Sequence, residues 1–277
     1  MIGEFRAASQ ERAPGLGTRL VEAAHSGETA ELKRALAEDA DGKVRAKVGG
    51  RALMGASQWG NLEIVNALLA AGIGVDFADS DADTALMSAA GGERTEVVRV
   101  LLAAGAAEDH LNYRGRTARM VAESMGHMET VALLRQARKA EAPAEVRYLE
   151  AAWDGDLAAL RLIQEGDGGR KLLESHGPLA LCHAAYRGHP TVATYLLDAG
   201  VPVDATIWEG KTALGLSVTA NHPPMARLLL ERGADPLKRD DSHGCAYSRA
   251  RGHARREIDD LIDEHMCRKH RDELGRK

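Results

Sequence analysis

The stretch Leu53-Met54-Gly55-Ala56 returns further along the chain as Leu86-Met87-Ser88-Ala89. When the residue before Ala52-Leu53 is taken as slot one, eight segments can be laid over one another. Their first residues are Thr18, Arg51, Thr84, Thr117, Val146, Leu179, Thr212 and Cys245. Every step between neighbouring first residues has the same length, except the step from Thr117 to Val146. A fixed period of about 33 residues is typical of proteins that stack one short unit many times.

Slot six holds a small residue in every segment. These residues are Ala23, Ala56, Ala89, Ala122, Ala151, Ala184, Ser217 and Ala250. A small side chain at one fixed helical position indicates that two helices approach closely there. A second apolar run follows at helical spacing, such as Ile64, Val65 and Leu68, and in four segments a glycine at slot 22 ends it. Those glycines are Gly72, Gly105, Gly200 and Gly233. Each segment therefore predicts two helices.

These patterns resemble the ankyrin repeat, which opens Thr-Pro-Leu-His-x-Ala and continues Gly-His before its second helix. Here the first motif reads Thr84-Ala85-Leu86-Met87-Ser88-Ala89, and it recurs in altered form from Thr212. The second motif stands at Gly126-His127 and Gly188-His189. The resemblance covers about residues 18 to 265. It implies an all-α fold, an ankyrin-repeat α-solenoid of paired antiparallel helices joined by short β-turn or finger loops.

The exceptional step, from Thr117 to Val146, is shorter than the others and predicts a break in the stack. The segment around it is helix-forming up to Pro143, which blocks continuation. We therefore expect an N-terminal extension (1–17), repeats 1–4 (18–134), an irregular junction without a regular finger (135–145), repeats 5–8 (146–265) and a basic C-terminal tail (266–277). A change of twist at the junction is one expectation, and a stack that runs on with one trimmed loop is the alternative.

Two further patterns bear on the core and on the class of partner. Slot four is Met in three successive repeats (Met54, Met87 and Met120), which we interpret as gap-filling core. The first predicted finger is basic (Lys43, Arg45, Lys47) and the second is acidic (Asp76, Asp79, Asp81, Asp83). Because a nucleic acid backbone attracts a surface of one sign, mixed fingers favour a protein partner over a nucleic acid.

In the ankyrin family the partner lies on the concave face, built from slots eight and nine of the first helix and from the finger tips. Transferred slot by slot, this resemblance implies the partner-binding residues Gln58, Trp59, Phe77, Tyr113, Met125, Trp153, Tyr186, Arg187 and Trp208. Trp, Tyr and Arg are the residue types most enriched in interface hot spots. Replacing Trp59 or Trp153 by Ala is thus expected to weaken binding with little loss of stability. The alternative is that some of these rings pack against neighbouring repeats.

Composition places few further limits on function. The net charge of −5 is small, and the three cysteines are odd in number and widely spaced, which argues against a disulfide framework. The N-terminal residues lack the apolar run of a signal peptide, and no stretch approaches the roughly 18 apolar residues of a membrane span. We expect a cytoplasmic protein that does not engage a membrane. Export by a route without a signal peptide stays open.

Three motifs resemble parts of a phosphate-binding, a catalytic or a metal-binding site, but their residues or geometry do not fit such a site. Gly210-Lys211-Thr212 ends like a phosphate-binding loop, but Ala205 stands where that loop needs glycine. Cys182 and His183 are adjacent on a helix and point about 100° apart, so they do not form a nucleophile and its base. His265, Cys267 and His270 on one helix do not close a tetrahedral metal site. We therefore expect no catalytic residue, metal site, cofactor or small-molecule substrate.

The function expected from the sequence is a non-catalytic module that binds another protein. One alternative is an inhibitor or immunity protein that blocks a single enzyme or toxin, which tight 1:1 binding would reveal. A second alternative, from another class, is an enzyme or a metal-dependent protein, which metal analysis of the purified protein would test.

Overall fold

The computed structural model describes residues 15–137, 142–252 and 255–275, with side chains up to residue 268. Within these ranges the chain forms sixteen α-helices in eight consecutive pairs, and no strand longer than a single bridge. This confirms the all-α repeat fold. Contacts divide the chain into two compact units, which we describe separately. Unit 1 comprises Met1–Asn112 and Thr117–Lys139, and unit 2 comprises Tyr113–Arg116 and Ala140–Lys277.

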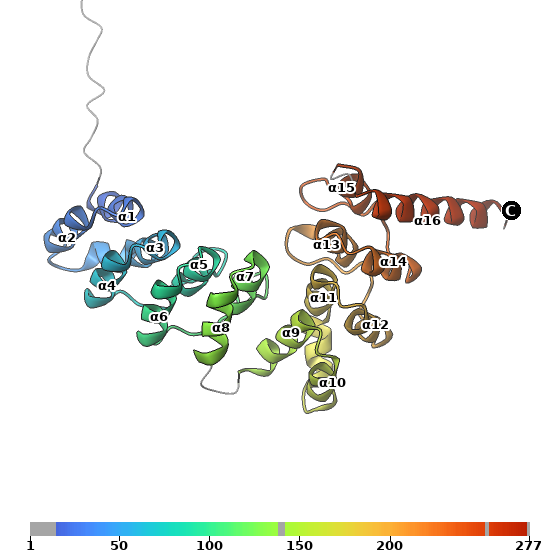
Figure 1. Ribbon diagram of the computed structural model, residues 1–277, viewed down its shortest axis with the longest axis horizontal. Coiled ribbons are helices and arrows are strands. Elements are labelled where there is room, and N and C mark those ends of the chain that lie inside the picture. The colour runs from blue at the N-terminus through green and yellow to red at the C-terminus, as the bar shows by residue number, and fades with distance from the viewer. Residues whose placement is uncertain (1–14, 138–141, 253–254, 276–277) are drawn as a thin grey trace, which may run out of the picture. The chain divides into compact units, whose positions relative to one another are not determined.

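Each unit contains four helix pairs (Figure 1). Those of unit 1 are α1 (Leu16–Ser26), α2 (Thr29–Glu38), α3 (Lys43–Trp59), α4 (Leu62–Ala70), α5 (Ala85–Gly91), α6 (Thr95–Ala103), α7 (Ala118–Met125) and α8 (Met128–Ala137). Those of unit 2 are α9 (Ala144–Asp154), α10 (Leu157–Glu165), α11 (Gly169–Arg187), α12 (Pro190–Asp198), α13 (Ala213–Thr219), α14 (Pro223–Glu231), α15 (Ala246–Gly252) and α16 (Arg256–Gly275). A one-turn 3-10 helix, Trp208–Gly210, precedes α13.

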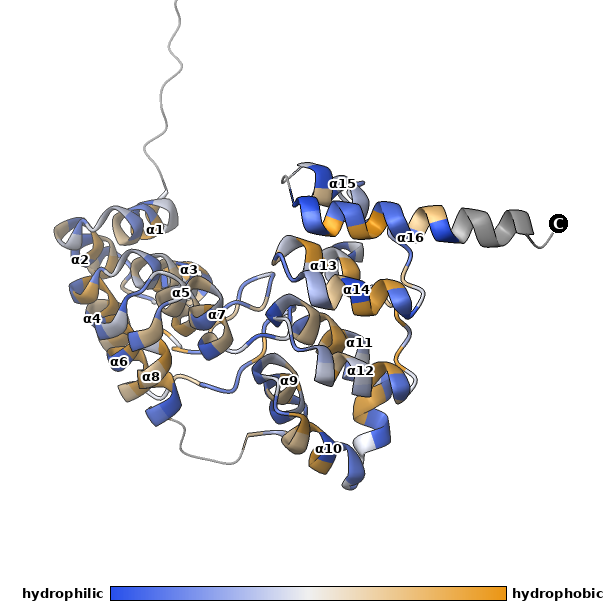
Figure 2. Ribbon diagram, turned by 45° about the vertical axis from the view of Figure 1, so that its right-hand side comes forward, coloured by the Kyte–Doolittle hydropathy of each residue, from blue (hydrophilic) through white to orange (hydrophobic). Residues whose placement is uncertain are grey.

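Within a unit, first helices pack on first helices and second helices on second helices. The small residues of slot six, such as Ala56 and Ala184, are buried. Figure 2 shows apolar residues along α4, α6 and α8, whose inner sides belong to the core of unit 1. Met87 and Met120 are buried and Met54 is partly buried, so the methionine stripe does fill the core.

In three repeats a threonine in slot one marks where the first helix begins. Thr84, Thr117 and Thr212 each cap a helix, because their side-chain oxygens accept the backbone N–H of the residue three positions on, at 3.1–3.4 Å. Repeats 2 and 6 instead have Arg51 and Leu179 in slot one, and there the helix runs through. Without a capping side chain, nothing local stops the helix from extending toward the N-terminus.

The basic first finger predicted from the sequence is therefore wrong. Lys43, Arg45 and Lys47 lie in the first turns of α3, and no finger loop precedes repeat 2. Residues 169–178 form the corresponding extension of α11 in unit 2. Tight finger loops do precede repeats 3, 7 and 8, where the N–H groups of Asp79, Ile207 and Asp240 each donate to the carbonyl four residues on. Each unit thus contains at least one finger loop and one first helix that is extended at its N-terminus.

The first three helix pairs of unit 1 match those of unit 2 closely in length and order. α4 begins at Leu62 and α12 at Pro190, and the same offset separates the start of α6, Thr95, from that of α14, Pro223. The long first helices, α3 and α11, both stand in the second pair of their unit. Positions related by this offset can therefore be compared directly between units.

Neighbouring repeats are also tied by polar links at one recurring place. In each link, the residue just before the second helix of one repeat forms a hydrogen bond with a backbone carbonyl. That carbonyl lies near the end of the first helix of the preceding repeat. His127 Nε2 bonds to the Gly91 carbonyl at 3.0 Å, and His189 Nε2 to the Trp153 carbonyl at 2.9 Å. Asn61, Arg94 and His222 make the equivalent links in their repeats. Each link satisfies a carbonyl that the end of a helix leaves unpaired.

Two predicted segments overlap helices of the structure. The C-terminal tail predicted for 266–277 continues α16, which runs unbroken from Arg256 to Gly275. The junction predicted for 135–145 includes residues 138–141, which lie outside the described residues; α8 ends at Ala137, and Pro143 precedes α9. A change of twist there stays a prediction.

Candidate protein-binding surface

We define the candidate surface as the C-terminal ends of the first helices together with the finger loops. In unit 1, Gln58 and Trp59 end α3, and Met125 ends α7. The Gln58 side chain is exposed, Trp59 is 57% exposed and Met125 62% exposed. In unit 2, Tyr113 stands in the loop before repeat 4 and is 72% exposed. The sequence prediction places these four side chains in solvent, and the structure does so too.

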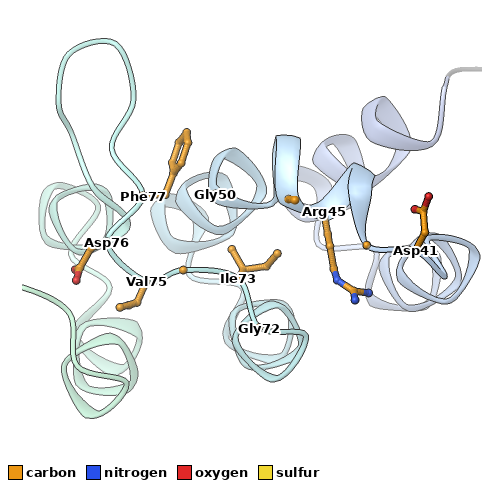
Figure 3. A pocket seen from close by; sticks show the side chains of 11 residues that line it. Asp41, Arg45, Gly50, Gly72, Ile73, Val75, Asp76 and Phe77 are labelled. Atoms are coloured by element: carbon orange, nitrogen blue, oxygen red, sulfur yellow. The ribbon is translucent and has the colours of Figure 1, made fainter.

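Phe77 is 38% exposed, and its ring also packs against α3. A pocket of about 630 Å³ opens in unit 1 between the start of α3 and the loop after α4. Figure 3 shows Phe77 standing beside Gly50 of α3, with Ile73 further along the same loop and Arg45 and Asp41 toward the other end. A Cβ at Gly50 would lie 2.0 Å from Phe77 Cγ. Glycine at this position therefore makes room for the ring.

Replacing Gly50 by Ala is expected to lower the free energy of unfolding by about 1 kcal/mol. Overpacking costs roughly 1–3 kcal/mol, which exceeds the gain of about 1 kcal/mol from alanine in a helix. Gly252→Ala in α15 is the control, since its Cβ would meet nothing within 4 Å. Urea unfolding followed by circular dichroism measures both variants. A Gly50→Ala protein as stable as the wild type would show that the ring does not depend on this glycine.

Trp153 is the clearest correction to the sequence prediction. The slot register predicts that it faces solvent, but it is 1% exposed. The His183 ring meets it edge-on at 5.3 Å between centroids, and the Tyr186 ring lies 5.9 Å away. The Arg187 guanidinium covers it at 5.1 Å from the ring centroid. All three covering residues come from α11 of the next repeat, so the slot register alone did not reveal them.

The remaining predicted residues of unit 2 gather at one place. Tyr186 and Trp208 are half-buried, and with Trp153 they line a pocket of about 220 Å³. Arg187 is also half-buried and lies over Trp153. The other lining residues are Arg114, Arg116, Cys182, His183, Lys211, Leu216 and Thr219. The lining of the pocket thus includes both aromatic rings and cationic side chains.

The sequence prediction missed the cations of this pocket. Arg114 and Arg116 come from the loop 113–116, and Lys211 from the finger before repeat 7. A signal was available, because Gly115-Arg116-Thr117 and Gly210-Lys211-Thr212 place a basic residue directly before a helix-capping threonine. The second of these is the segment that resembles a phosphate-binding loop, and in the structure it is a finger turn that runs into the cap of α13.

The loop 113–116 is held against α11 of unit 2. His183 Nε2 donates to the Arg114 carbonyl at 3.0 Å, and Arg114 lies 3.9 Å from the Glu209 carboxylate. Gly115 has a φ of +62°, and a Cβ there would lie 2.3 Å from a methyl carbon of Leu179. Only glycine permits this approach without strain. Repeat 6 has no finger of its own, and this loop lies beside its first helix, α11.

Burial shifts the titration of the two adjacent residues on α11. It lowers the pKa of His183 to about 4, opposed by the hydrogen bond to Arg114. It raises the pKa of the Cys182 thiol well above its usual range, so the sulfur stays protonated. Cys182 and His183 are respectively 1% and 2% exposed. The Cys182 thiol, which stays protonated, is a poor nucleophile, and His183, with its lowered pKa, is a weak base.

Two findings bear on the expected absence of a metal site and of a membrane-spanning segment. Among the side chains that the structure describes, no three His, Cys, Asp or Glu residues lie close enough together to hold a metal ion. His270, considered with His265 and Cys267, lies outside those side chains. None of the described helices is long and apolar enough to cross a membrane.

Comparison with known proteins agrees with the repeat geometry. The family model described as ankyrin repeats (3 copies) matches residues 53–144 and 149–240. A putative ankyrin repeat-containing protein of Treponema pallidum (strain Nichols) is 36% identical over 85 residues, which are 31% of this chain and 28% of that relative. The match thus spans less than a third of the relative's length. Ankyrin repeats are generally protein–protein interaction modules. The chain belongs to the ankyrin-repeat family.

Proposed function

We propose that this chain is a non-catalytic interaction module that binds a partner protein through the candidate surface. The observation that carries the proposal is the exposure of Trp59, Tyr113 and Met125 at helix ends and a loop tip. A buried tryptophan would add to stability, whereas an exposed one adds little to the fold. Large rigid side chains that stand in solvent on one kind of surface are the usual anchors of protein interfaces.

The charges near this surface support a protein partner over a nucleic acid. The finger before repeat 3 carries Asp79, Asp81 and Asp83, and Asp79 uses its carboxylate to accept the N–H groups of the other two at 2.9 Å. This acidic finger repels a phosphate backbone. The finger before repeat 7 instead presents Lys211. Patches of opposite sign suit a protein with a complementary pattern.

Trp59→Ala is expected to weaken partner binding about 30-fold, the equivalent of roughly 2 kcal/mol for a hot-spot aromatic. The partner is first captured from a native lysate with the wild-type chain and then titrated as a purified protein by calorimetry. Leu162→Ala is the matched control, because Leu162 is 70% exposed but belongs to the second helix α10. It should bind as the wild type does.

The double variant Trp59→Ala/Tyr113→Ala sharpens this experiment, since it removes one anchor from each unit. A double variant that is folded by circular dichroism yet binds with wild-type affinity would contradict the proposal. The same titration separates two roles for the surface. Very tight 1:1 binding to one enzyme, with loss of that enzyme's activity, would indicate an inhibitor, whereas moderate affinity for several proteins would indicate a scaffold.

A further inference from the structure

The pocket of unit 2 is lined by two kinds of side chain. Arg114, Arg116 and Lys211 are its cations, here called the cationic wall, and Trp153, Tyr186 and Trp208 supply aromatic rings. None of the residues that line the pocket is acidic. Its volume of about 220 Å³ is on the scale of one amino-acid side chain. The pocket therefore has the size for a side chain and the charge for an anion.

We propose that this pocket binds a carboxylate side chain, Asp or Glu, of the partner protein. The inference rests on the proposed function, because it assigns part of the same surface to one chemical group of the partner. The carboxylate lies against Lys211 and the two arginines, where charge-assisted hydrogen bonds are strong. The methylene groups of the incoming side chain pack on the Trp208 ring.

The finger before repeat 7 already displays this chemistry at the edge of the pocket. Lys211 Nζ contacts the Glu209 carboxylate at 2.6 Å, and Arg114 lies 3.9 Å from the same group. The hydrogen bond from Lys211 lowers the pKa of Glu209, so the ionised carboxylate is favoured there. Glu209 is exposed and does not line the pocket. It shows that these cations are placed to hold a carboxylate, and it competes with an incoming one.

A cationic ligand suits the pocket less well, although aromatic rings often bind cations. The Trp153 ring is already covered by the Arg187 guanidinium, so that cation–π site is occupied within the chain. A further positive charge would meet the three cations of the wall. Burial keeps His183 neutral at physiological pH by lowering its pKa, so this residue does not change the sign of the pocket.

Unit 1 carries different residues at the equivalent positions. When the units are aligned by the offset that brings Pro190 onto Leu62, the positions of Tyr186, Trp208 and Lys211 correspond to Gln58, Ser80 and Asp83. Tyr186 and Trp208 are thus replaced by polar side chains, and Lys211 by an acid. The same fold position is acidic in one unit and cationic in the other, so unit 1 serves as an internal control for the chemistry of unit 2.

The test uses the full chain with Trp59 replaced by Phe, so that the fluorescence reports only Trp153 and Trp208, which both line the pocket. The probe is glutamate blocked as its N-acetyl α-methylamide, which carries a single side-chain carboxylate. The expected result is a saturable fluorescence change at millimolar concentrations. The equivalent glutamine and lysine derivatives should give none.

Single-residue variants test whether the cationic wall is responsible for binding of the probe. Lys211→Gln should weaken probe binding about tenfold, the cost of one charge-assisted hydrogen bond. Lys171→Gln removes the same charge from an exposed position of α11 and should change nothing. Glu209→Gln should strengthen binding, because the internal competitor is lost. Unfolding midpoints equal to the parent's show that each variant is folded.

Several outcomes would overturn the inference. These are the absence of a saturable change, equal binding of the glutamine derivative, or an unchanged affinity in Lys211→Gln. Tighter binding of the blocked phosphoserine derivative would replace the carboxylate assignment. Failure here is distinguishable from failure of the proposed function, which is decided by the effect of Trp59 and Tyr113 on the partner itself. Loss of partner binding in those variants with no probe binding removes only the pocket inference.

Discussion

Trp153→Ala is expected to lower the free energy of unfolding by about 4 kcal/mol, because removing a buried tryptophan costs roughly 3–5 kcal/mol. The ring is 1% exposed and lies between α9 and α11 of unit 2. Alanine would leave a cavity against His183 and Tyr186 and would remove the aromatic surface on which Arg187 lies. The loss includes packing, ring contacts and one cation–π contact.

Trp59→Ala is the matched control, since that ring is 57% exposed and its removal should change stability by less than about 1 kcal/mol. Urea unfolding is followed for both variants by circular dichroism and by fluorescence, because units of a repeat protein unfold in separate steps. Equal stability of the two variants would show that Trp153 is not packed as described. The expectation from the sequence, that Trp153→Ala leaves stability intact, is thereby replaced.

Acidification from pH 6.5 to pH 4 is expected to destabilise unit 2 by about 3 kcal/mol through His183 alone. The pKa of His183 is lowered from its ordinary value of 6.5 to about 4 by burial. The unfolded chain therefore takes up a proton at a higher pH than the folded chain does. The contribution of His183 to stability is full above pH 6.5 and is lost as the pH falls toward 4, and a pKa difference of this size corresponds to the stated energy.

His183→Gln tests this pH dependence, because glutamine keeps an N–H donor for the Arg114 carbonyl but does not titrate. The quantity to compare is the difference in unfolding free energy between pH 7 and pH 4, in the wild type and in the variant. His189, whose pKa burial also lowers, contributes to both proteins and cancels. An identical loss of stability in the two proteins would exclude His183 as its source.

The candidate surface was predictable where exposure follows from the repeat register alone. Trp59, Tyr113 and Met125 are exposed at the slots and loop tip assigned to them. Trp153 occupies a comparable slot, yet α11 brings His183 and Arg187 over it. The slot of a residue determines the direction in which its side chain points from its own helix. Burial also depends on which residues the next repeat presents, and these differ from one repeat to the next.

The pocket of unit 2 lay beyond any argument from one repeat. It needs the loop 113–116, which precedes repeat 4 in sequence but belongs to unit 2 by its contacts. That placement depends on Gly115, whose missing Cβ admits Leu179, and on the bond from His183 to Arg114. A sequence period of one repeat does not predict a contact between segments that lie two repeats apart.

By itself, the sequence determined the eight helix pairs, their antiparallel stacking and the close approach at slot six, because these depend on a period and on small or capping residues within each repeat. The sequence also held the signal for the helical extensions before Arg51 and Leu179, since slot one there lacks a capping threonine. The tertiary structure alone decided the burial of Trp153 and the pocket of unit 2. The physical reason is that helix capping and periodicity are local, whereas burial and pocket formation are settled by neighbours that the chain brings together only on folding.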